Sequence, residues 1–317
     1  MAPRAVVFAY HDVGARCLAV LLAHGVEVAL VVTHRDDPRE TIWFASVERL
    51  ARERGLDVIA PDAAGLPALA ARLASLAPDF LFSFYYRHLL PASLLASATR
   101  GAYNIHGSLL PKYRGRVPVN WAILRGERET GATLHEMVAK PDAGGIVDQL
   151  AVPILPDDNA LDVFRKVTVA AEIVLDRSLP ALVAGRARAV PQDLARGSYF
   201  GGRRPEDGRI DWSQGARAIH DLVRAVAPPY PGAFSTIGSS TLRVLRTRVM
   251  DPLPDPLPGE REKAAPLIHL EGNRIVARCS DGRSLAILEA ELDGEPLTAT
   301  HFEQRFGRAG VRPGETQ

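Results

Sequence analysis

Short apolar runs alternate with segments of helical spacing over the first hundred residues. The runs that predict strands are Ala5–Ala9, Val26–Thr33, Asp57–Ala60, Asp79–Phe84 and Gly101–Ile105. The segments between them that predict helices are Ala15–Ala23, Ile42–Arg54, Pro67–Leu76 and Pro91–Ala98. Strand interiors that are apolar throughout, alternating with helices, indicate a mostly parallel sheet covered on both faces. We therefore predict an α/β, doubly wound, Rossmann-like fold, in which ligands bind beyond the carboxyl ends of the strands.

The pattern changes in the rest of the chain. Thr133–Val138 and Ile146–Ile154 predict strands on either side of a turn-rich loop, and Leu161–Leu182 predicts a long helix. Pro191–Asp211 is rich in Arg, Gly and Pro, which is typical of a linker. A helix at Ala216–Ala225 is followed by short strand-like runs between residues 233 and 292, which predict a small β-barrel with a solvated loop at 252–258. We expect domains at residues 1–203 and 204–308 and a frayed tail at 309–317.

Composition and charge narrow the class of protein. The 317 residues include 38 Lys and Arg and 37 Asp and Glu, a formal net charge of +1. Proteins that bind nucleic acid usually carry a clustered basic excess, so we expect no nucleic-acid partner. Without a signal-peptide pattern or a run long enough to span a bilayer, we predict a cytoplasmic protein with no membrane insertion. A β-rich C-terminal domain leaves a homodimer open, because a sheet edge can pair with a second copy.

Cysteine and histidine spacings argue against a disulfide framework and a metal site. Cys17 and Cys279 lie far apart in apolar contexts, which predicts two buried free thiols. The nine histidines lack the close spacings that ligate zinc, so we expect no metal.

The densest group of reactive side chains follows the fifth predicted strand. Asn104 and His106 are two residues apart, so in an extended chain both point to one face. An amide can donate a hydrogen bond to a developing oxyanion, and an imidazole can move a proton near neutral pH. That pair suits acyl transfer, although a single histidine at a strand end more often has only a structural role. Asp142, in a Gly-rich turn, is either a turn former or the carboxylate that orients His106.

Several other residues are weaker candidates. They are His11 and Asp12, His34, Asp36 and Asp37, the aromatic segment Phe84–His88, the phosphate-clamp candidates Arg114, Arg116, Arg203 and Arg204, and the hydroxyl of Ser108. For each of these residues, the alternative to a functional role is an ordinary structural role in a loop, in the core or on the surface. No GxGxxG follows the first strand, which argues against a dinucleotide-dependent oxidoreductase. Ser108 lacks the GxSxG elbow of a serine nucleophile.

The run from Asn104 to Gly115 (NIHGSLLPKYRG) resembles the signature of the 10-formyltetrahydrofolate-dependent formyltransferases, with Thr130-Gly131, Thr133 and Asp142-x-Gly144 downstream. Within that superfamily, the segments FAYHD at 8–12, FSFYYRHL at 82–89 and HGSLLPKYRGR at 106–116 are similar to enzymes that N-formylate UDP-4-amino-4-deoxy-L-arabinose. Those enzymes form one half of bifunctional polymyxin-resistance proteins, which modify lipid A of the lipopolysaccharide. The likeness is close over about residues 5–250 and thins out after them, and its C-terminal piece is an OB-like barrel.

The resemblance implies roles for individual residues. Asn104 would stabilise the tetrahedral intermediate, His106 would transfer protons, and Asp142 would pair with His106 and raise its pKa. The co-substrate 10-formyltetrahydrofolate would bind at His88, Leu89, Leu90, Arg116, Val138, Ala139, Lys140, Pro141 and Asp142. A nucleotide-linked amino sugar would be the acceptor, with no metal. The bifunctional enzymes continue into a decarboxylase, whereas this sequence stops before one, which leaves open a separate decarboxylase, a different amino sugar or a shortened form of a longer chain.

Three other readings remain open at this stage. Formylation of methionyl-tRNA would need a basic surface for the nucleic acid. A folate hydrolase would use water in place of the amine. A catalytically inactive folate- or nucleotide-sugar-binding module would not need to retain Asn104, His106 and Asp142.

Overall fold

The computed structural model describes residues 2–38, 40–63, 65–250 and 264–314. The chain divides into two compact units. The first contains residues 1–118, 129–153 and 164–202, and the second contains residues 119–128, 154–163 and 203–317. The predicted loop at 252–258 lies outside the described residues.

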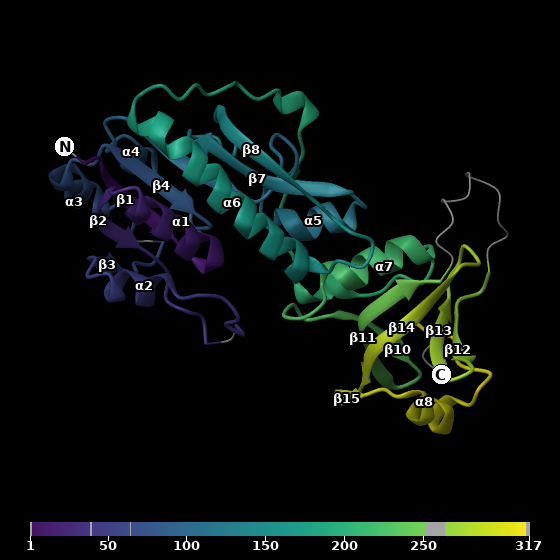
Figure 1. The fold of residues 1–317 in the computed structure, drawn as a ribbon. Helices are drawn as coiled ribbons and strands as arrows, with labels where there is room; N and C mark the ends of the chain where they lie inside the picture. The colour runs from purple at the N-terminus through teal and green to yellow at the C-terminus, as the bar shows by residue number, and fades with distance from the viewer. Residues whose placement is uncertain (1, 39, 64, 251–263, 315–317) are drawn as a thin grey trace. The chain divides into compact units, whose positions relative to one another are not determined.

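The first unit is built on a seven-stranded sheet in the order β3-β2-β1-β4-β5-β7-β8 (Figure 1). Its strands are β1 (Arg4–Ala9), β2 (Glu27–Val32), β3 (Val58–Ile59), β4 (Phe80–Phe84), β5 (Gly101–His106), β7 (Glu129–Glu136) and β8 (Ile146–Pro153). The first five are mutually parallel, and β7 runs antiparallel to its neighbour β5. Because β8 is antiparallel to β7, it runs in the same direction as the first five strands. The predicted Rossmann-like, mostly parallel sheet is therefore confirmed. The carboxyl ends of β1 and β4 are neighbours at the point where the strand order reverses, which is where such sheets bind ligands.

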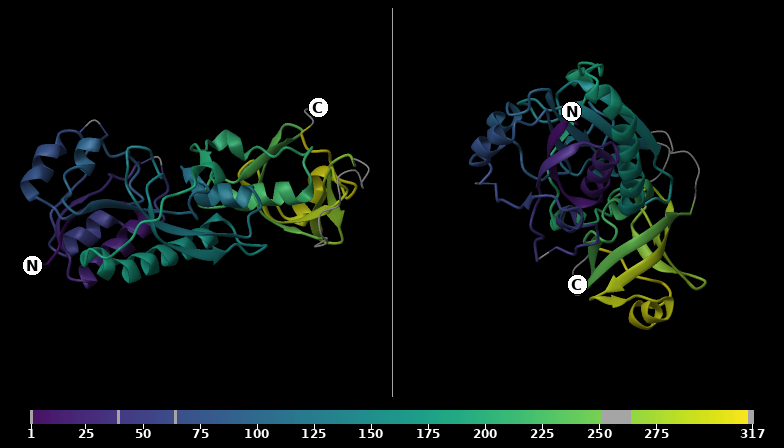
Figure 2. Two further views of the ribbon diagram at one scale, coloured as in Figure 1. Left: turned by 90° about the horizontal axis from the view of Figure 1, so that it is seen from above. Right: turned by 60° about the vertical axis from the view of Figure 1, so that its left-hand side comes forward.

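Helices cover both faces of this sheet. They are α1 (His11–Ala23), α2 (Val47–Glu53), α3 (Leu69–Leu76), α4 (Ala92–Leu95) and α6 (Ala160–Val183), whose first turn belongs to the second unit. Helix α5 (Pro118–Leu124) lies in the second unit from Val119 onward. Phe8 on β1 packs in one buried cluster with Leu73 of α3 and Leu94 of α4. On the opposite side α1 and α6 lie together, joined by Arg16 and Glu172 (Figure 2). Alternate residues of each buried strand thus meet helices on alternate faces.

The second unit is an antiparallel sheet with two helices. Its strands are β10 (Ala233–Ile237), β11 (Ser240–Val249), β12 (Leu267–Glu271), β13 (Arg274–Arg278), β14 (Ser284–Leu292) and β15 (Glu295–Pro296). They follow the order β10-β11-β14-β13-β12, with β15 beside β14. Helices α7 (Ala216–Ala225) and α8 (Ala299–Phe306) supply Ile219 and Phe302 to its buried core. The prediction of a small OB-like β-barrel is confirmed as far as an antiparallel C-terminal sheet domain, whose described strands pair in an open order from β10 to β12.

Three segments differ from the sequence prediction. The second helix begins at Val47 rather than Ile42, capped by the Ser46 hydroxyl, because Phe44 instead stacks on His11. The predicted linker contains a short strand, β9 (Tyr199–Phe200), which pairs in parallel with β6 (Arg114–Gly115), and two 3₁₀ turns, Leu194–Arg196 and Pro205–Gly208. Within the described part of the predicted tail, residues 309–314, the backbone of Val311 exchanges two hydrogen bonds with Ile268 of β12.

Gly131 on β7 provides a test of the strand packing. A Cβ at this position would lie 2.2 Å from the carbonyl oxygen of Leu150 on β8, and neither backbone can move without breaking the ladder. We expect Gly131→Ala to lower the free energy of unfolding by about 1–3 kcal/mol in urea denaturation, as overpacking does. Gly201→Ala is the matched control, because a Cβ there meets nothing within 4 Å. Equal stability of the two variants would contradict this packing.

Candidate active site

Strand pairing brings four polar side chains together where β5 and β7 meet in the first unit's sheet. In the register of β5 and β7, Asn104 lies opposite His135 and His106 lies opposite Thr133. Residues directly opposite each other, and residues two apart on one strand, share a face of the sheet. Asn104 and His106 were predicted from sequence. His135 was not, because its segment reads only as a strand, and the register that sets it against Asn104 appears only in the fold.

Asp142 reaches the same place from the loop between β7 and β8. Its backbone adopts a left-handed conformation (φ 53°), which Asp tolerates better than most residues. The side-chain amide of Gln192 donates to the carbonyl oxygens of Asp142 and Gly144 at 3.0 and 2.6 Å and so holds the loop. The carboxylate accepts a hydrogen bond on Oδ2 from the backbone N–H of Gly115 at 2.8 Å. The predicted partner of His106 is thus fixed on both sides by hydrogen bonds.

The other carboxylate oxygen of Asp142 faces two imidazoles. Oδ1 lies 3.6 Å from Nδ1 of His106 and 3.7 Å from Nε2 of His135. All three side chains are at most 15% exposed. Electrostatic interactions are stronger in such a site than in water, because little solvent screens them.

The hydrogen bonds of His106 leave one ring nitrogen for proton exchange. Its Nε2 lies 2.7 Å from the carbonyl oxygen of Tyr113, which can only accept, so Nε2 carries the proton of that hydrogen bond. Nδ1 then faces Asp142 and the interior of the site. The proton that His106 can take up or release is the one on Nδ1.

His135 is held as a neutral ring. Burial lowers its pKa to about 4 and outweighs the opposing effect of the nearby Asp142 carboxylate. Its Nδ1 donates to the carbonyl oxygen of Glu136 at 2.8 Å, so the unprotonated Nε2 must accept. The donor is the side-chain amide nitrogen of Asn104, at 3.0 Å. His135 therefore fixes which way the Asn104 amide points.

A buried network holds the loop that follows His106. The Thr133 hydroxyl donates to the carbonyl oxygen of Ser108 and accepts from the backbone N–H of Leu110. The side-chain amide of Gln149 reaches both Thr133 Oγ1 and the Leu110 carbonyl at 2.8 Å. The fully buried Ser108 hydroxyl donates to the Lys112 carbonyl at 2.7 Å, which is a structural role rather than that of a nucleophile.

Close packing brings the loop after β4 to the same place. A Cβ at Gly107 would lie 1.9 Å from the hydroxyl of Tyr85, so only glycine allows this approach. Tyr85 and the buried His11 ring, which follow β4 and β1, lie 6.4 Å apart between ring centres. Burial lowers the pKa of His11 to about 3, so its ring is uncharged near neutral pH.

The residues predicted to bind folate lie on three segments of the first unit. His88 lies in the loop after β4 and contacts the rings of His34 and Tyr86. Leu89, the next residue in that loop, is 75% exposed. Exposed Val138, Ala139 and Lys140 lead to Pro141 and Asp142 in the loop between β7 and β8. Leu90 is half-buried, and Arg116 is exposed, with its backbone N–H donating to Phe200. Of these residues, Asp142 is the one with an observed contact to the two imidazoles of His106 and His135.

Most of the weaker candidates have structural partners. The Asp12 carboxylate accepts from the backbone of Ala45, and Asp36 accepts from the Tyr10 hydroxyl. His34 accepts from the backbone of Arg87, and burial lowers its pKa to about 4. Cys17 and Cys279 are buried free thiols, as predicted.

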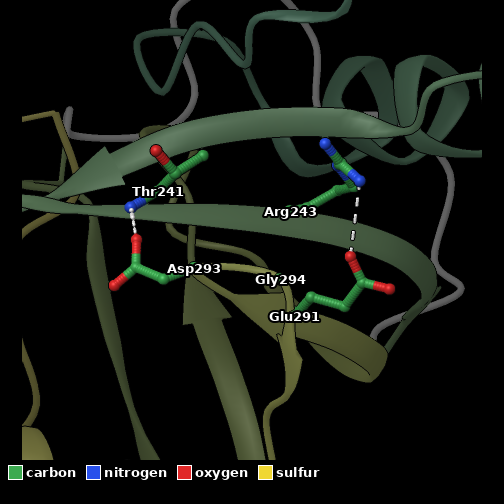
Figure 3. Close-up of a pocket in the computed structure, with 5 residues that line it drawn as sticks. All are labelled: Thr241, Arg243, Glu291, Asp293 and Gly294. Atoms are coloured by element: carbon green, nitrogen blue, oxygen red, sulfur yellow. Dashed lines mark hydrogen bonds and ion pairs between the residues drawn. The ribbon is translucent and has the colours of Figure 1, made fainter.

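A separate hollow lies in the second unit, between β11 and the turn after β14 (Figure 3). Its polar groups face one another: Arg243 pairs with Glu291 at 3.4 Å, and Asp293 accepts from the backbone of Thr241 at 2.8 Å. Because these groups are already satisfied, they do not indicate a ligand. Among the described residues no group of three or more His, Cys, Asp or Glu is placed to hold a metal ion, and no helix is long and apolar enough to cross a bilayer.

Comparison with known families decides the class of the protein. Residues 14–179 match the family described as formyl transferase, and residues 203–307 match the formyl transferase C-terminal domain. The chain belongs to the formyl transferase family. It is a formyl-transferring enzyme with both of the family's domains.

Solved structures share the fold of this formyltransferase. An N-formyltransferase from Helicobacter canadensis, in complex with folinic acid and dTDP-3-aminofucose, is 19% identical with a TM-score of 0.70, over 90% of this chain and 99% of that one. A 4-N formyltransferase from Francisella tularensis is 22% identical with a TM-score of 0.59, over 73% and 91%. HypX from Aquifex aeolicus, in complex with tetrahydrofolic acid, is 19% identical with a TM-score of 0.62, over 96% and 47%.

His135 supplies the first test of the site. His135→Leu removes the acceptor that orients Asn104, and we expect the formyl-transfer rate to fall about 10–100-fold, as for a lost neighbour of a reacting group. His135→Gln can still accept from Asn104 and should recover most of the rate. The Tm of both variants separates this effect from unfolding. Equal rates for the two variants would refute the orienting role.

The buried histidines also predict how stability depends on pH. The pKa of His135 lies below the ordinary value of 6.5, so the unfolded chain binds this proton more tightly than the folded one. The free energy of unfolding should therefore fall as the pH drops from about 6.5 towards 4. His11 and His34 act in the same direction. Thermal unfolding across this range should show a smaller loss in His135→Gln; an identical pH profile would contradict the buried neutral ring.

Proposed function

We propose that this formyltransferase moves the formyl group of 10-formyltetrahydrofolate to the primary amine of a nucleotide-linked sugar. The observation that carries the proposal is the meeting of an oriented amide, an imidazole and a carboxylate around one buried point, at Asn104, His106 and Asp142. Formyl transfer needs a donor for the oxyanion and a group that moves one proton. These three side chains supply both.

The proposed reaction begins with attack of the neutral amine nitrogen on the formyl carbon. The amide of Asn104 donates to the oxygen as it becomes negatively charged, while His135 holds that amide in place. Nδ1 of His106 accepts the proton that the amine loses, and Asp142 stabilises the resulting imidazolium. When the bond between the formyl carbon and N10 of the folate breaks, that proton returns to N10. The products are a formamide on the sugar and tetrahydrofolate.

The surface of the predicted folate segments is consistent with a flat, partly apolar ligand. Leu89 is 75% exposed and Val138 is 46% exposed, although both are aliphatic. Exposed apolar side chains beside a reactive centre commonly mark a binding surface. The loop of Val138 also carries Asp142, so folate bound there would lie next to the catalytic carboxylate.

We propose UDP-4-amino-4-deoxy-L-arabinose as the acceptor, with UDP-4-deoxy-4-formamido-L-arabinose as the product in lipid A modification. The segments at 8–12, 82–89 and 106–116 support this choice through their resemblance to enzymes of that reaction. Another UDP- or dTDP-linked amino sugar is the second candidate, favoured by the fold shared with the Helicobacter canadensis enzyme. The net charge of +1 argues against methionyl-tRNA.

The catalytic roles can be tested by substitution. We expect Asn104→Ala to lower the rate of formyl transfer about 10²–10³-fold and His106→Ala about 10²–10⁴-fold, the usual losses of an oxyanion donor and a general acid–base. Product mass and folate absorbance report the reaction. His301→Ala, on α8 in the second unit, is the control and should keep the full rate. Near-normal turnover in either active-site variant would remove its assignment.

The acceptor is identified in the same assay. A mass gain of one formyl group on UDP-4-amino-4-deoxy-L-arabinose supports the proposed substrate. Transfer only to a dTDP-linked amino sugar would replace it with the second candidate. Transfer to methionyl-tRNA alone would overturn the proposed class of acceptor.

A further inference from the structure

The structure separates the four arginines that the sequence suggests as phosphate ligands. Arg203 donates to the Asp207 carbonyl and lies 5.1 Å from the ring centre of Trp121, and Arg116 and Arg204 are exposed. Arg114 is only 8% exposed. It is thus the buried member of the set.

The guanidinium of Arg114 has no acceptor among the described residues. Its Nε is buried without a hydrogen-bond partner, and among the described residues no carboxylate forms an ion pair with the guanidinium. A buried charge without a partner costs several kcal/mol in general, so proteins normally pair it. Arg224, which is equally buried in the second unit, shows the normal case, because it pairs with Asp221 at 2.7 Å.

The position of Arg114 is fixed by its two neighbours in the chain. The carbonyl oxygen of Tyr113 accepts from His106, and the N–H of Gly115 donates to Asp142. The backbone of Arg114 is held as well, because β6 pairs with β9. The backbone that carries this unpaired guanidinium is therefore held next to the proposed catalytic centre.

We propose that Arg114 binds an oxyanion of the substrate, namely the diphosphate of the nucleotide sugar. This inference rests on the proposed function. A guanidinium matches phosphate oxygens with two parallel hydrogen bonds. In a bound nucleotide sugar, one sugar ring separates the reacting amine from the diphosphate. The folate carboxylates are the other source of oxyanions, and they lie beyond the aminobenzoyl ring and an amide, farther from the reacting atoms.

Binding and stability together test the proposal. We expect Arg114→Met, which keeps the apolar stem, to bind UDP or dTDP about 10–100-fold more weakly by calorimetry, as for a lost charged hydrogen bond. Binding of uridine, which has no phosphate, and of 5-formyltetrahydrofolate should not change. Because the variant loses an unpaired buried charge, its ligand-free Tm should equal or exceed that of the unaltered protein. Arg114→Lys should show intermediate nucleotide binding and provides a second folded variant.

Three results would overturn the proposal. Unchanged binding of UDP and dTDP in both variants would remove Arg114 from the nucleotide site. Weaker binding of 5-formyltetrahydrofolate alone would assign it to the folate carboxylates. A lower Tm with equal loss of both ligands would show a structural role. Failure of the proposed function looks different, because the unaltered protein would then bind neither nucleotide nor transfer a formyl group to any amino sugar.

Discussion

The carboxylate of Asp142 joins the parts of the chain that make up the site. One of its oxygens is held by the backbone of Gly115, and the other faces the rings of His106 and His135. Loop 137–145, β5, β6 and β7 therefore meet at a single buried charge. Hydrogen bonds from the side-chain amides of Gln192 and Gln149 hold the loop of Asp142 and the loop after His106.

The two histidines beside this carboxylate have different tasks because their surroundings differ. His135 is almost fully buried, its Nδ1 is committed to a carbonyl, and its low pKa keeps it neutral. It serves as an acceptor that orients Asn104. His106 commits its other nitrogen, Nε2, to a carbonyl, so its Nδ1 faces the site. In the proposed reaction, the imidazole of His135 is thus a fixed support, and that of His106 exchanges the proton.

How much the sequence reveals depends on whether a feature is local. The five apolar runs of the parallel sheet were predicted within about one or two residues, because a strand buried on both faces must be apolar. Asn104 and His106 were found because they lie two apart on one strand. His135 and the pairing of Arg114 with Tyr199 were missed, because strand register over dozens of residues is not visible locally. The predicted start of α2 at Ile42 was wrong, because Phe44 packs on His11 in a tertiary contact that the local sequence does not reveal.

The central claim is that the charge of Asp142 organises formyl transfer, and the single-turnover rate of Asp142→Asn tests it most directly. Asparagine can still accept from Gly115 but carries no charge towards the two imidazoles, so the fold should persist with a Tm near that of the unaltered protein. The account predicts a rate at least about 10²-fold lower, as for loss of a group that stabilises a catalytic imidazolium. A rate within a few-fold of the unaltered enzyme, in a folded variant, would contradict it.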